Sequence, residues 1–180
     1  YDNNASYGFE SGYLTSYSVN CAVGSVPTVN TSFVVYDELR SGVNASGATP
    51  QAIYIPSQGS ITATCDNTAT NRVVGFDYAL EVVRKPYYTI GSETPIEVKY
   101  IPPIKYSASV QIEVDDVFLE SGYSFLTAGK EEKTVSFVIN GRDGTSLQSL
   151  TIPKASLVNE QLSASADGSV RLTLNYVGHS

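Results

Sequence analysis

The chain contains the run Tyr106-Ser107-Ala108-Ser109-Val110-Gln111-Ile112-Glu113-Val114-Asp115, in which apolar residues hold the even positions and polar residues the odd ones. Successive side chains of a β-strand point to opposite faces, so this run predicts a strand with one buried and one wet face. The same alternation governs Arg72–Arg84, Glu132–Ile139 and Val170–Tyr176. Period two is therefore the dominant signal, and it predicts an all-β protein.

Shorter runs rich in Thr, Val, Ile and Tyr predict further strands, because these residues suit a pleated, half-buried surface. They lie near Tyr13–Cys21, Val29–Tyr36, Ala52–Ile55, Ile61–Cys65, Ile96–Ile101 and Leu147–Ile152. Turn residues separate the runs: we expect a tight hairpin at Asp167-Gly168, a longer turn at Asn140–Gly144 and an exposed loop at Gly42–Pro50. Pro102-Pro103 cannot donate to a ladder and predicts a corner between sheets.

About ten short strands separated by turns predict a β-sandwich or distorted barrel with long amphipathic strands. Only Asp115–Thr127 is suited to a helix, so we expect at most one short helix. The sequence has no short fixed repeat and no linker-like change in composition. Its 180 residues therefore form a single β domain, residues 1–180.

The composition narrows the function classes. The chain has 11 Lys+Arg against 18 Asp+Glu, a formal net charge of −7. This acidic balance, without a basic run, argues against sequence-specific nucleic-acid binding. The longest apolar runs are only a handful of residues, too short for a membrane-spanning helix. His179, the single histidine, leaves almost no material for histidine catalysis or a histidine metal site.

No constellation of residues points to catalysis. The densest carboxylate cluster is Glu113, Asp115 and Asp116, but it lacks the spacing of a calcium loop. The first two lie on one strand face and Asp116 on the other, so they do not converge. We expect no enzyme, no metal and no cofactor, although a two-carboxylate glycosidase stays open. Cys21 and Cys65 are interpreted as two small buried residues, with a disulfide as the alternative.

The order of segments within residues Asn71–Asp116 resembles that of a known protein family. A long amphipathic strand is followed by Arg84-Lys85-Pro86-Tyr87-Tyr88-Thr89-Ile90-Gly91-Ser92 and by a strand that begins after Pro95. This order resembles the tail tube and related tail structural proteins of tailed bacteriophages, which often carry a similar Arg/Pro/Tyr/Gly-Ser segment between two long strands. The segments Thr15–Thr28 and Ile152–Gln161 are similar to the opening and closing parts of such subunits. The loop Gly42–Pro50 departs from them.

The resemblance implies a structural subunit without catalysis, found in the virion and assembled in the host cytoplasm. Such subunits form six-membered rings that stack into a hollow tube, and their long strands join into a continuous inner barrel. The partners implied are further copies of the chain, other tail proteins such as sheath, baseplate or terminator, and DNA that passes without specific binding; no membrane is involved. Two alternatives stay open: an extracellular β-sandwich adhesin or pilin-like binding module, suggested by the 13 tyrosines and many Ser and Thr, and a β-sandwich hydrolase.

Two sets of site residues follow if six subunits close a barrel from the strands 72–84 and 106–115. The polar faces then line the lumen and repel phosphate; the predicted lumen residues are Asp77, Glu81, Ser107, Ser109, Gln111 and Glu113. The predicted subunit interface is Pro86, Tyr87, Tyr88, Ile90 and Gly91, because large apolar side chains on a turn need cover. The alternatives are that the polar faces meet bulk solvent and that the turn folds back on its own subunit.

Overall fold

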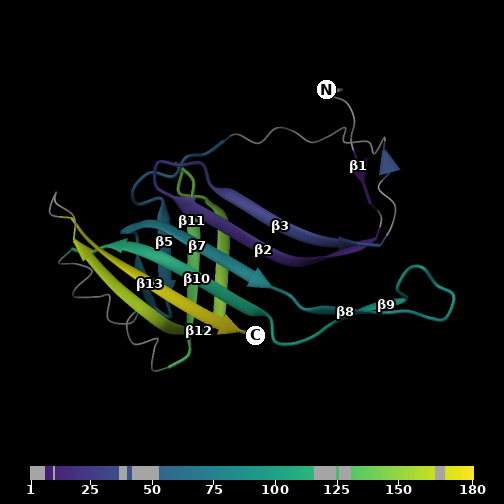
Figure 1. Cartoon of the computed structure of the whole chain (residues 1–180). Helices are drawn as coiled ribbons and strands as arrows, with labels where there is room; N and C mark the ends of the chain where they lie inside the picture. The colour runs from purple at the N-terminus through teal and green to yellow at the C-terminus, as the bar shows by residue number, and fades with distance from the viewer. Residues whose placement is uncertain are drawn as a thin grey trace.

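The computed structural model describes residues 7–9, 11–36, 40–41, 53–115, 125, 131–164 and 169–180. These residues form one large antiparallel sheet and two short two-stranded ones, which confirms the predicted all-β class (Figure 1). Three expected features lie mostly or wholly outside the described residues: the helix at 115–127, the loop 42–50 and the tight turn at 167–168.

The strands follow the alternating runs of the sequence. Their bounds are β1 Tyr7–Gly8, β2 Gly12–Ala22, β3 Thr28–Val35, β4 Arg40–Ser41, β5 Ile61–Cys65, β6 Thr68–Thr70, β7 Val73–Glu81, β8 Arg84–Tyr87, β9 Glu97–Tyr100, β10 Lys105–Glu113, β11 Lys133–Asn140, β12 Ser146–Ala164 and β13 Val170–His179. The large sheet has the order β3-β2-β7-β10-β13-β12-β11-β5-β6, and β1-β4 and β8-β9 form the two small sheets.

Strand β12 turns the large sheet into two layers. Its first half pairs with β11 up to Ala155, and its second half, from Ala155 to Ala164, pairs with β13. The layer β3-β2-β7-β10-β13 therefore continues through β12 into the layer β11-β5-β6. Among the described residues β3 and β6 form the two ends of the sheet, so it folds over as a sandwich and does not close into a barrel.

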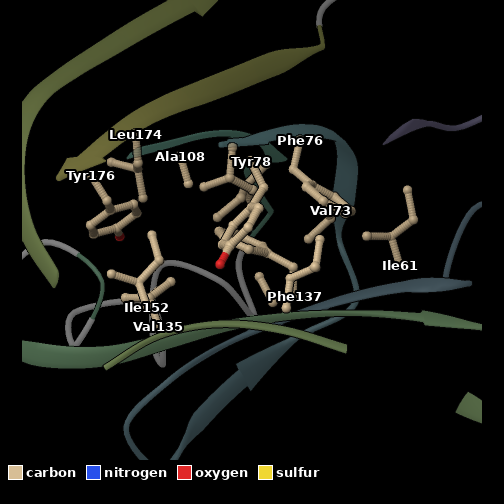
Figure 2. Close-up of a cluster of buried hydrophobic side chains, with 14 of the residues drawn as sticks. Ile61, Val73, Phe76, Tyr78, Ala108, Val135, Phe137, Ile152, Leu174 and Tyr176 are labelled. Atoms are coloured by element: carbon tan, nitrogen blue, oxygen red, sulfur yellow. The ribbon is translucent and has the colours of Figure 1, made fainter. Parts of the chain in front are cut away.

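The core fills the space between the two layers (Figure 2). Phe76 of β7 stacks on Phe137 of β11 with ring centroids 5.0 Å apart and planes 10° apart. Tyr78 donates its hydroxyl to the Thr151 carbonyl of the opposite layer, and burial raises the pKa of Tyr78 to about 12. Tyr176 donates to the Phe125 carbonyl. Each tyrosine thus buries an apolar ring and keeps a partner for its polar atom.

The turns largely match their predictions, and one predicted strand is wrong. A turn over Gly141–Thr145 joins β11 to β12, and Pro102-Pro103 lies where the chain passes from the β8-β9 sheet into β10. Of the strand expected at Ala52–Ile55, the described residues 53–55 are not in a strand, and Ile53 is 79% exposed. Within this run Tyr54 does pack against the core, and its hydroxyl hydrogen-bonds Ser60, so its burial does not require a strand.

Candidate assembly surfaces

The large sheet presents a polar face on the side opposite the core. The β7–β10 register places Asp77 opposite Ser109, Ala79 opposite Ser107 and Gly75 opposite Gln111. The odd-numbered residues from Gly75 to Glu81 therefore share a face with those of β10. The structure brings all six predicted lumen residues together on this face, and each of them is exposed or half-buried. We call it the polar face.

The carboxylates of the polar face have hydrogen-bonding or cationic neighbours. Asn20 of β2 donates its side-chain amide to Asp77. Gln58 donates to Glu113 over 2.7 Å. Two cations lie at the margins of the face: Lys105 is the register partner of Glu81, and Arg171 of β13 that of Glu113. The sequence of β7 and β10 alone did not reveal these neighbours, because Asn20, Gln58 and Arg171 come from other segments.

A shallow open groove of about 460 Å³ crosses the polar face. Its polar lining comprises Ser18, Asn20, Asn30, Asp77, Ser107, Ser109 and Asn175. These are neutral hydrogen-bonding groups apart from one carboxylate. The described part of the chain contains no group of three or more His, Cys, Asp or Glu side chains able to hold a metal ion. The arrangement provides a wet, weakly charged surface.

The second candidate surface is the hairpin β8–β9, which extends away from the sandwich (Figure 1). The side chains near its tip are exposed: Tyr87 by 41%, Tyr88 by 52%, Ile96 by 65% and Ile90 completely. Gly91 has φ +85°, a left-handed conformation that glycine adopts without strain. The predicted interface residues are thus brought together on one projecting element, which we call the hairpin tip (residues 87–96).

Aromatic and cationic side chains make contacts along this hairpin. Arg84 lies over the Tyr13 ring at 5.9 Å, and Tyr88 meets Tyr36 edge-on with ring centroids 6.4 Å apart. Lys85 and Lys99, which are register partners, lie 5.5 and 5.2 Å from the centroid of Tyr87. The ring face attracts both ammonium groups. These lysines were not predicted as site residues, although the Lys-x-Tyr spacing of positions 85 and 87 is visible in the sequence.

Cys21 of β2 and Cys65 of β5 are thiols buried in the core, on opposite layers. Burial disfavours the thiolate and raises the pKa of each to about 11. The structure therefore agrees with the interpretation of Cys21 and Cys65 as two small buried residues and not with a disulfide between them.

At pH 8 we therefore expect the folded protein to react very slowly with a thiol-specific disulfide reagent, because the reactive thiolate is scarce and shielded. The same protein in denaturant should give two thiols per chain. A Thr89→Cys variant, with a thiol at the exposed hairpin tip, provides the control and should react fast when folded. Rapid reaction of both native thiols in the folded wild type would contradict their burial.

Among the residues that the structure describes, no helix is long and apolar enough to cross a membrane. Comparison with known proteins found no matching family model and no significant match to a curated protein.

Proposed function

We propose that this chain is a structural subunit of a phage tail tube. Copies assemble into rings, six to a ring as the resemblance implies, and the rings stack around a lumen that conducts DNA. The observation that carries the proposal is the polar face, which extends over β7, β10 and β13 on the side opposite the core. An antiparallel sheet with one packed and one wet face suits the wall of a channel.

The chemistry of the polar face fits DNA that passes without binding. The polar groups of its groove are mostly Ser and Asn, beside the exposed Val158 and Val177, and Asp77 accepts a hydrogen bond from Asn20. The two marginal cations are register partners of carboxylates, whose negative charge lowers the local positive potential. Repulsion from the carboxylates acts over roughly 8 Å, the Debye length at physiological salt. Such a wall holds DNA weakly at every position.

The hairpin tip supplies the contact to a neighbouring subunit in this proposal. Its exposed apolar side chains are typical of protein–protein contacts. The neighbour is another copy of the chain in the same or an adjacent ring; at the tube ends, sheath, baseplate or terminator proteins take its place. The subunit acts in the virion by assembly, with no catalytic step.

Placing lysine at both Asp77 and Glu113 tests the lumen assignment. We expect tubes to form largely as in the wild type and DNA release to slow by roughly tenfold or more, since charge-lined channels change ion and ligand rates by such factors. The measurements are electron microscopy of the tubes and the rate of DNA release from assembled tails. The matched control carries lysine at Glu131 and Glu132, exposed residues that precede β11 in the other layer.

Assembled tubes with carboxylates 77, 81 and 113 on their outer surface would overturn the lumen assignment. Unchanged DNA release from normal tubes of the lysine variant would also count against it.

A further inference from the structure

We propose that copies of this chain join head to tail through two sheet edges. Strand β3 of one copy pairs with the second half of β12, Leu157–Ala164, of the next. This inference rests on the proposed function and names the strand contact within a ring.

Both edges are open in the described part of the chain. There β3 pairs only with β2, and Leu157–Ala164 pairs only with β13. Monomeric proteins protect open edges with charges, proline or a covering segment. Strand β3 has no charged residue and no proline, and all eight of its residues are exposed. The β12 segment has Glu160 as its only charged residue. Strand β3 therefore carries no such protection, whereas the β12 segment has Glu160 on its core side, opposite Leu174, and a bulge between Leu157 and Asn159. No like charges would meet between the two edges.

The strand directions of the two edges are complementary. The layer has six members in the order β3-β2-β7-β10-β13-β12, each antiparallel to its neighbour. With an even number of alternating strands, the first and the last run in opposite directions. A copy placed alongside by rotation therefore brings β3 antiparallel to β12 and continues the pattern. One such contact covers both edges, whereas pairing of β3 with another β3 leaves β12 open.

Exposed apolar side chains favour one register. Val29 is the partner of the buried Val19, and Leu162 that of the buried Leu172. Both therefore lie on the core side of the sheet, yet they are 50% and 67% exposed because the sheet ends beside them. A slip of one residue would put them on opposite faces. Placing Val29 opposite Leu162 keeps them together and pairs positions 28–32 of β3 with positions 163–159 of β12, up to the bulge at Val158.

The same register staggers the copies. Followed from strand to strand across the sheet, the register places Val29 level with Tyr176 of β13, whereas Leu162 is level with Leu172 of the same strand. Pairing Val29 with Leu162 therefore displaces neighbouring copies along the strand direction by 176 − 172 = 4 residues. A stagger repeated in one direction tilts the strands, as closure of a barrel requires.

Cysteine cross-linking of the full chain tests this pairing. Opposite Cβ atoms in an antiparallel pair are about 4.5–5.5 Å apart, within reach of a short bis-maleimide. An equimolar mixture of Val29→Cys and Leu162→Cys proteins should give about tenfold more covalent dimer than either alone, because apposed thiols have millimolar effective concentrations. The double variant should give a ladder of covalent oligomers on a denaturing gel. The native thiols are buried and should not contribute.

The control pairs Val29→Cys with Gln161→Cys, which lies on the polar face opposite Thr173 and should cross-link far less. Efficient dimers of Val29→Cys alone would show β3–β3 pairing and overturn the proposal. Tubes in the microscope without a ladder from the double variant would overturn the edge pairing and leave the tail-tube function standing. A ladder without rings or tubes would support the pairing and overturn the tail-tube function.

Discussion

The double variant Tyr88→Ala with Ile90→Ala should fold as a monomer that forms neither rings nor tubes. Ile90 is fully exposed and Tyr88 about half exposed, so their removal leaves the core intact. Burial of a large apolar side chain contributes about 1.5–3 kcal/mol, and both are lost at every subunit contact. Sedimentation velocity and electron microscopy measure assembly, and circular dichroism checks the fold.

The matched control for this variant is Thr89→Ala with Glu93→Ala, two exposed polar positions of the same hairpin tip. It should assemble normally. Normal tubes from the Tyr88/Ile90 variant would mean that the tip does not carry the contact. The two single variants separate the contributions of the two side chains to assembly. Tyr88 already touches Tyr36 of its own chain, so Ile90→Ala should cause the larger loss of assembly.

Phe137→Ala should lower the free energy of unfolding by about 3–5 kcal/mol, the range for a phenylalanine removed from a packed core. Phe137 is fully buried on β11 and stacks on Phe76 of the other layer, so its loss leaves a cavity between the two layers. Urea unfolding of the isolated subunit, followed by far-ultraviolet circular dichroism, measures the change.

Ile90→Ala serves as the control for stability, because a side chain with no buried surface should change the free energy of unfolding by no more than about 0.5 kcal/mol. Equal denaturant midpoints for Phe137→Ala and wild type would contradict the two-layer core.

The alternating runs predicted the strands that have one face in the core. Strands β7, β10, β11 and β13 follow the predicted runs closely, since burial of every second residue leaves period two in the sequence. Composition predicted strand β12 over Leu147–Ile152, and only the resemblance and the expected Asp167-Gly168 hairpin pointed to its continuation, which reaches Ala164. Its second half lies at an open edge with both faces largely exposed, so no burial pattern marks it.

The surfaces were predicted less completely than the strands. Alternation placed Asp77 and Ser109 each on the polar face of its strand, but their pairing depends on a register set by the whole sheet. The donors of the polar face, Asn20 and Gln58, come from distant segments that no local pattern connects to it. The hairpin tip was found because a Pro- and Gly-bracketed turn carried large apolar side chains, a local signal.

Electron microscopy of the purified wild-type protein at high concentration, with native mass spectrometry of the same sample, tests the tail-tube proposal most directly. The proposal predicts six-fold rings or hollow tubes, with masses at multiples of the 19.3 kDa subunit. A stable monomer across the whole concentration range, with no ring or tube in any field, would contradict it.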